Sequence, residues 1–182
     1  MSRNVKVAAL AGRRVDRAGA STIRFPASSI PKVRAGVEQV FLEEGIGLLV
    51  SAAASGADLI ALEVAQRLRI RCRVVLPFEA SRFRATSVVD QSNDWGVLYD
   101  SIISEVEAMG DLVVLEGERS DDAAYAYTTI AILKEANAAA HPQLATAILI
   151  WDGTSRGEDD FADQFRRLAR AAGMRERVIS TL

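Results

Sequence analysis

Residues 47–65 read "GLLVSAAASGADLIALEVA" and contain three successive patterns. The apolar residues up to Val50 are typical of a buried strand, and the small residues from Ser51 to Gly56 indicate a tight turn. Ile60, Val64 and Leu68 then recur at helical spacing, with alanines between them, which predicts a helix that lies close to a sheet. A strand, a short turn and an amphipathic helix in this order form the repeating unit of a parallel α/β sheet.

The same alternation extends over the whole chain. Strands are expected at 5–12, 47–54, 72–78, 111–117, 145–153 and 177–181, separated by helical patterns. This order predicts one domain over residues 1–182, with a Rossmann-like, doubly wound, mostly parallel sheet of five to six strands and helices on both faces. Periodicity fades between Glu79 and Asp94, so this segment is expected to be a long connection of the kind that tends to cover a site.

Composition excludes several classes of protein. The chain has 182 residues, 49% of them hydrophobic, a size and content suited to one domain with its own core. Its net charge of −2 and 6% aromatic content argue against a basic, stacking groove for nucleic acid. Cys72 is the only cysteine, so no disulfide framework is expected. Without a signal-like or membrane-spanning run, a cytoplasmic protein with no membrane partner is expected.

Polar and small residues gather where the expected strands end. In a doubly wound sheet, ligands bind beyond the carboxyl ends of the strands, near the point where the strand order reverses. Three segments reach that edge: "AGRRVD" after the first strand, "SAAASGAD" after the second and "WDGTSRGEDD" after the fifth. The candidate ligand contacts there are Gly12, Arg13, Ser51, Ser55, Gly56, Asp58, Trp151, Asp152 and Gly153.

These residue types suit a nucleotide or a sugar phosphate. Amides at a helix start favour an anion, and an arginine such as Arg13 can hold phosphate with two parallel hydrogen bonds. Asp58 or Asp152 would accept hydrogen bonds from ribose hydroxyls, and Trp151 would stack on a base. We therefore expect a phosphate or ribose above residues 52–56, with no metal and no cofactor.

Each of these residues also has a purely structural interpretation. The small residues of the second segment serve equally to let the helix pack on the sheet, and Asp58 is favoured in a first helical turn by the helix dipole. Trp151 is equally a core aromatic residue, and Arg14 a solvated surface charge. His141 has no second histidine with which to bind a metal. Residues 90–94, with Arg82 and Arg84, form either a charged lid or an exposed loop.

The ordered set of short motifs resembles the SLOG superfamily, which groups the DNA-processing Smf/DprA proteins with the Lonely Guy phosphoribohydrolases. The motifs are "LAGRRVD" (10–16), "RFP" (24–26), "SAAASGADLIALEVA" (51–65), "LPF" (76–78), "FRATSV" (83–88), Trp95 and "IWDG" (150–153). They look closest to bacterial SLOG domains found beside signalling modules. The resemblance implies a Rossmann-like sheet and a nucleotide site formed by the same three segments.

Two departures from that superfamily bear on function. Ala52 and Ala53 stand where many relatives have paired glycines, which leaves less room for a phosphate. The region "DGTSRGEDDFAD" lacks the glycine-rich loop and glutamate of the Lonely Guy enzymes. The resemblance therefore favours a non-catalytic nucleotide sensor that passes occupancy to a signalling partner or a second copy of the chain.

Three other functions stay open at this point. A hydrolase would cleave the N-glycosidic bond of a nucleoside 5'-monophosphate, with Glu158, Asp159 or Asp160 as candidate catalytic acids. A binder of single-stranded nucleic acid is disfavoured by the charge balance. A domain whose pocket has lost its ligand would serve protein interaction alone, and an occluded cleft would indicate it.

Overall fold

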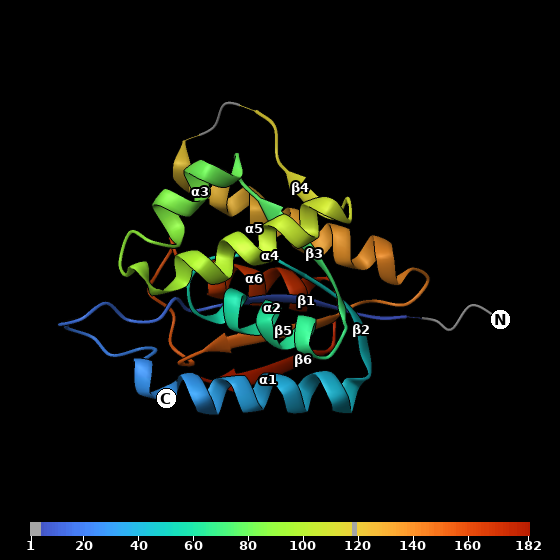
Figure 1. Ribbon diagram of the computed structural model, residues 1–182. Helices are drawn as coiled ribbons and strands as arrows, with labels where there is room; N and C mark the ends of the chain where they lie inside the picture. Colours follow the sequence, from blue (N-terminus) through green and yellow to red (C-terminus); the bar gives the residue numbers. More distant parts are fainter. Residues whose placement is uncertain (1–4, 118–119) are drawn as a thin grey trace.

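The computed structural model describes residues 5–117 and 120–182, which form a single six-stranded sheet with helices on both faces (Figure 1). The strands are β1 (Lys6–Gly12), β2 (Ile46–Ser51), β3 (Arg71–Leu76), β4 (Leu112–Val114), β5 (Thr146–Trp151) and β6 (Glu176–Ser180). The α-helices are α1 (Ile30–Glu44), α2 (Ala57–Arg67), α3 (Ala80–Ser87), α4 (Gly96–Ala108), α5 (Asp121–Ala140) and α6 (Phe161–Ala171). Two 3-10 turns, η1 (Ala27–Ser29) and η2 (Asn93–Trp95), precede α1 and α4.

The strand order is β4-β3-β2-β1-β5-β6, and every neighbouring pair is parallel. The chain therefore builds outward from β1 in one direction as far as β4 and then crosses over to place β5 on the other side of β1. This confirms the predicted α/β class and Rossmann-like, doubly wound sheet. The strand order reverses between β1 and β5, where such sheets bind ligands.

Alternation along the strands divides the core into two layers. Ala8 and Leu10 of β1 belong to a buried cluster with α1, α2 and α4, while Val7 and Ala9 belong to a second cluster with α5 and α6. This is the period of two that a strand buried on both faces requires. In Figure 1, α1 lies along one face of the sheet, and α5 and α6 cover the other.

The helices on the first face lie close to the strands because α2 presents small side chains. Ala57, Ala61 and Ala65 are all buried, as the alanine pattern in the sequence predicts. The expected strand at 47–54 ends earlier, at Ser51, and the residues up to Gly56 form the turn into α2. The expected strand at 111–117 is likewise shorter, since β4 covers only 112–114.

The expectation of an irregular connection over 79–94 is wrong for its first half, which forms α3. Only Phe83 and Ser87 of this helix are buried, so the segment shows little hydrophobic periodicity. Its stability comes from distant residues instead: the ring of Phe83 stacks on Tyr99, with 6.2 Å between centroids. The Tyr99 hydroxyl also donates a hydrogen bond of 2.9 Å to the carbonyl of Ala80.

The loop between β1 and α1 extends beyond the carboxyl edge of the sheet, at the left of Figure 1. Asp16 orders this loop, because one of its carboxylate oxygens accepts hydrogen bonds from the amides of Arg24 and Phe25, each 2.9 Å long. Phe25 is fully buried beneath it. Among the described residues, no helix is long and apolar enough to cross a membrane.

Candidate ligand site at the carboxyl edge of the sheet

The small residues of the β2–α2 turn make room first for the chain itself. Gly56 has φ +97°, and a Cβ atom there would lie 2.6 Å from the amide nitrogen of Val15 and 2.8 Å from the carbonyl oxygen of Arg13. A Cβ on Gly12 would lie 2.5 Å from that of Ala57. The turn after β2 is therefore packed directly against the backbone that leaves β1.

That packing also uses amides that were candidates for binding phosphate. The N–H of Ala57 donates to the carbonyl of Arg13 over 3.0 Å, and the N–H of Ser55 donates to the carbonyl of Ser87 over 3.0 Å. The N–H of Ala54 donates to the carboxylate of Asp58 over 3.1 Å. These three amides at the start of α2 are thus bonded within the protein.

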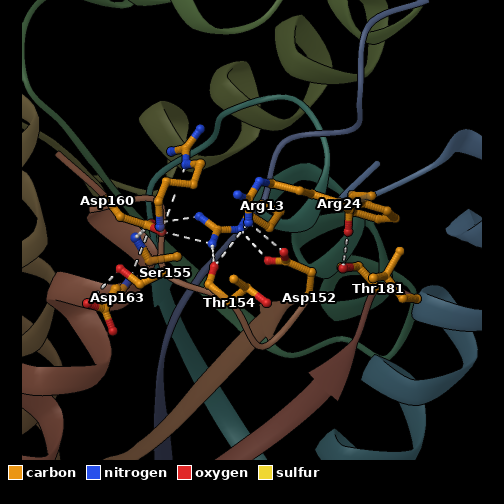
Figure 2. A network of polar contacts seen from close by, with 12 residues as sticks. Arg13, Arg24, Asp152, Thr154, Ser155, Asp160, Asp163 and Thr181 are labelled. Atoms are coloured by element: carbon orange, nitrogen blue, oxygen red, sulfur yellow. Dashed lines mark hydrogen bonds and ion pairs between the residues drawn. The ribbon is translucent and has the colours of Figure 1, made fainter. Parts of the chain in front are cut away.

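Arg13 lies at the centre of a buried ion network (Figure 2). Its Nε donates to Asp152 Oδ1 over 2.8 Å, and its two terminal nitrogens donate to both oxygens of Asp160 over 2.6 and 2.8 Å. A further bond of 2.5 Å goes to the carbonyl of Thr154. Because these bonds use four of the guanidinium's five N–H donors, little of Arg13 is left for a ligand.

The network fixes the loop after β5 as well as the arginine. Asp160 is fully buried and caps α6, accepting hydrogen bonds from the amides of Ala162 and Asp163. Burial opposes its charged form, but the bonds from Arg13 and from the amide of Arg156 outweigh this and hold the pKa of Asp160 below its ordinary value. The pKa of Asp152 is lowered in the same way: burial opposes the shift, and Arg13 and Arg24 outweigh it.

Several other candidate residues lie near this network. Trp151 is 5% exposed and belongs to the core, with the guanidinium carbons of Arg13 and Arg166 lying 5.5 and 5.4 Å from its ring centroid. Gly153 is exposed, as are Glu158 and Asp159 in the turn before α6.

Both serines of the β2–α2 segment are buried. The Ser51 hydroxyl donates to the carbonyl of Ala52 over 2.8 Å, and the Ser55 hydroxyl accepts from Arg14 Nε over 2.9 Å. Only Asp58 among the candidate acids lines the large cavity at this edge.

That cavity has a volume of about 580 Å³, within the range of small-molecule sites. It lies where the loop after β1, the turn before α2, helices α3 and α5 and the start of α6 meet. Its walls include Gly12 and Arg13 from the first predicted segment, and Ala54 and Asp58 from the second. The cavity thus lies at the edge of the sheet that the sequence indicates, although most of the candidate residues stand around the cavity rather than in its wall.

Asp58 is the buried acid of the cavity. Its side chain is 8% exposed, and Oδ2 accepts the bond from Ala54, while Oδ1 has no hydrogen-bond partner among the described residues. Desolvation by burial raises the pKa of this carboxyl to about 7, although the Ala54 amide and the charge of Arg14 oppose the shift. Asp58 therefore presents an oxygen that can either accept or, when protonated, donate a hydrogen bond to a ligand.

An aromatic wall stands across the same cavity. Phe83 of α3, Tyr125 of α5 and Phe161 of α6 all line it, and the rings of Tyr125 and Phe161 lie 5.7 Å apart. The Tyr125 hydroxyl lies 2.6 Å from the Ser87 hydroxyl, which joins α5 to α3. The sequence prediction does not include this wall. The stretch "AYAYTT" (124–129), which sets two tyrosines and two threonines in an alanine-rich helix, is the signal that points to it.

Four more arginines line the cavity and were not predicted as ligand contacts: Arg14, Arg17, Arg24 and Arg156. Arg14 and Arg24 are paired with Asp90 and Asp152, whereas Arg17 and Arg156 are more open. Arg17 is exposed, and among the described residues its guanidinium has no ion-pair partner. Arg156 is about half exposed, and its Nε lies 3.8 Å from Asp160, which is already bonded to Arg13. Both side chains thus retain donors for an anion. Among the described residues, no group of histidine, cysteine and acidic side chains is arranged to bind a metal.

The architecture defines a Rossmann-like α/β protein, and comparison with solved structures finds a similar chain. The X-ray structure of DNA processing protein A (DprA) from Streptococcus pneumoniae matches with a TM-score of 0.44 and 16% sequence identity, covering 95% of the present chain and 58% of DprA. At this identity the likeness concerns the fold alone. No protein-family model and no curated protein matches the sequence.

Proposed function

We propose that the protein binds a nucleotide or a nucleotide-derived ligand in the cavity at the carboxyl edge, and that it acts as a sensor of this ligand. The observation that carries the proposal is the set of groups in one cavity of about 580 Å³: aromatic rings, a buried carboxyl with an open oxygen, and arginines with open donors. A base, a ribose and a phosphate offer the three complementary surfaces.

The assignment of contacts differs from the one that the sequence favours. Trp151 is enclosed in the core and does not line the cavity, so it is not the residue on which a base stacks. Tyr125 and Phe161 line the cavity and take that role. Asp58 keeps its proposed contact with ribose hydroxyls because its Oδ1 is open. Phosphate would meet Arg17 and Arg156, since the guanidinium of Arg13 is used by Asp152 and Asp160.

Binding without turnover is favoured over N-glycosidic hydrolysis. Neither Glu158 nor Asp159 lines the cavity, and Asp160 is bonded to Arg13. None of these acids is therefore placed to assist departure of a base from a bound nucleotide. Asp58 lines the wall, and burial raises its pKa to about 7, so release of free base would make Asp58 the first candidate for a catalytic acid.

The test is a thermal-shift series with adenosine, AMP, ADP-ribose, NAD and cyclic mono- and dinucleotides, with chromatography of each mixture for free base. A ligand at one hundred times its dissociation constant adds about 2.7 kcal/mol of stability. We expect at least one of these compounds to stabilise the protein without release of base. If none of these compounds shifts the melting temperature, the proposal is contradicted. Release of free base would show that the protein is a hydrolase rather than a sensor.

A pair of alanine variants locates the binding. Ala54→Leu adds three carbons inside the cavity, and Ala85→Leu adds the same atoms to the exposed side of α3. The stabilising ligand should lose its effect on Ala54→Leu and keep it on Ala85→Leu. The melting temperature of each variant without ligand shows whether it is folded.

A further inference from the structure

Arg14 and Asp90 form an ion pair at the edge of the cavity. Arg14 lines the cavity, and its two terminal nitrogens donate to the two carboxylate oxygens of Asp90 over 3.0 and 2.5 Å. Its Nε donates to Ser55 on the turn before α2. The loop after β1 is thereby tied to the segment that follows α3.

That segment borders the cavity as well. Ser87 and Gln91 both line it, so Asp90 lies between two residues of the wall. The backbone of Ser87 is tied to Ser55 over 3.0 Å, and Val88 is fully buried in the core. The ion pair of Asp90 with Arg14 is therefore the contact that holds residues 90–92 against the loop after β1. Because Val89 also packs against the core, release of Asp90 would free residues 90–92 and not the two valines before them.

The adjacent arginine shows why Arg14 can exchange partners. Arg13 is 4% exposed and its partners are buried, whereas the side chains of Arg14 and Asp90 are 28% and 31% exposed. An ion pair in contact with water contributes little net stability, so its partners separate at small cost. A phosphate presents the same two-oxygen acceptor to a guanidinium as a carboxylate, with more negative charge.

We propose that Arg14 recognises the anionic group of the ligand together with Arg17 and Arg156, and that Asp90 occupies the Arg14 guanidinium until a phosphate replaces it. The exchange frees residues 90–92 from the loop after β1, so the occupancy of the cavity is reported by that segment at the surface. This inference rests on the proposed function, since it names the group that reads the ligand's charge and the element that responds.

Asp90→Asn and Asp100→Asn form a matched pair for the test. Asp100 also receives two hydrogen bonds from one arginine, Arg84, over 2.7 and 2.9 Å. That pair is more exposed, at 38% and 54%, and neither of its residues lines the cavity. Each variant removes one exposed carboxylate from an arginine. Only the first removes the internal competitor for Arg14.

Inorganic pyrophosphate is the probe, with binding followed by thermal shift in wild-type protein, Asp90→Asn, Asp100→Asn and Arg14→Gln. We expect Asp90→Asn to bind pyrophosphate about fivefold more tightly than wild type, Asp100→Asn to match wild type and Arg14→Gln to bind at least tenfold more weakly. The backbone NMR order parameters of residues 90–92 should fall when pyrophosphate is added to wild type and stay constant in Arg14→Gln.

Equal pyrophosphate affinity in Asp90→Asn and Asp100→Asn overturns the inference, as does the absence of pyrophosphate binding to Asp90→Asn. Adenosine separates this failure from failure of the proposed function, because adenosine carries no phosphate. Suppose that adenosine still stabilises the wild type and does not stabilise Ala54→Leu. The cavity then binds nucleosides, and only the proposed role of Arg14 and Asp90 is rejected.

Discussion

Arg13 and Asp58 lie at the same edge of the sheet, in segments that the sequence marks equally for ligand binding, yet their surroundings differ. Arg13 is buried with two carboxylates that use most of its donors, while Asp58 is buried with one oxygen bonded and the other open to the cavity. A charged group whose hydrogen bonds are complete holds the fold together. A polar group buried with an open position lowers stability and is available to a ligand.

The largest effect that tests this contrast is expected from Arg13→Met. Without Arg13, the fully buried Asp160 and the nearly buried Asp152 lose their main cation, and such a loss costs about 3–5 kcal/mol. Urea unfolding at pH 7 measures it. Arg14→Gln is the control, because removal of its exposed pair with Asp90 should cost less than about 1 kcal/mol. Equal losses in the two variants would contradict the distinction.

The same network has a pH signature. The folded-state pKa values of Asp152 and Asp160 lie below the ordinary value of 3.8, so their contribution to stability is present above about pH 4. It is lost as the pH falls through the folded-state values, because both side chains must then take up protons. The difference in stability between wild type and Arg13→Met should therefore narrow below pH 4.

Asp58 should show the opposite dependence on pH. Its pKa rises from 3.8 to about 7 on folding, so between these values the folded chain binds a proton that the unfolded chain has lost. Stability must then fall as the pH rises from about 4 to 7, by about 4 kcal/mol in all at roughly 1.4 kcal/mol per unit. Asp58→Asn, which cannot titrate, should remove this slope and be the more stable protein at pH 8.

Urea unfolding at pH 4.5, 6 and 7.5 measures the slope for both proteins. Asp159→Asn on the exposed turn is the control and should keep the wild-type profile. Parallel profiles of wild type and Asp58→Asn would show that the buried carboxyl does not titrate in this range. The contrast between the paired charge of Arg13 and the open carboxyl of Asp58 would then not be supported.

Gly56→Ala tests whether the β2–α2 turn is shaped by the chain that packs against it. With φ +97° and ψ −124°, the backbone is in a region that other residues avoid, and the added Cβ would meet the backbone of 13–15. We expect a loss of about 3 kcal/mol. Gly19→Ala, at φ +75° with nothing within 4 Å, should lose about 1 kcal/mol in the same thermal unfolding assay. If the two variants lost similar stability, the contact of the added Cβ with the backbone of 13–15 would contribute nothing beyond the strain of the positive φ.

The sequence allows prediction of the sheet because its signals are local. Apolar runs and helical spacing locate all six strands, and their alternation predicts the parallel sheet and the edge at which the cavity lies. Helix α3 is missed because its stability comes from Phe83 against Tyr99 and from Ser87 against Tyr125, contacts that no local pattern contains.

The chemistry of the site is harder to predict, since it depends on which polar groups meet. Arg13 and Asp152 are 139 positions apart, and no spacing rule indicates that they satisfy each other. A sequence shows an arginine at a strand end but not whether its donors are already used. For the same reason Arg17, which belongs to the polar loop after β1, is not distinguished from Arg13 and Arg14 until the cavity is seen.

Arg17→Gln is expected to have the smallest effect on stability. It tests whether an arginine with open donors, unlike Arg13, binds the ligand. Because the guanidinium of Arg17 is exposed and has no ion-pair partner among the described residues, its loss should change the free energy of unfolding by less than about 0.5 kcal/mol. If its open donors bind phosphate, the affinity for AMP should fall about five- to tenfold while that for adenosine is unchanged. Arg69→Gln, an exposed arginine just before β3 and outside the cavity wall, is the control. That result would make Arg17 the converse of Arg13, since Arg17 would bind the phosphate and contribute nothing to stability. An equal loss of affinity for AMP and adenosine would instead show that Arg17 only shapes the loop.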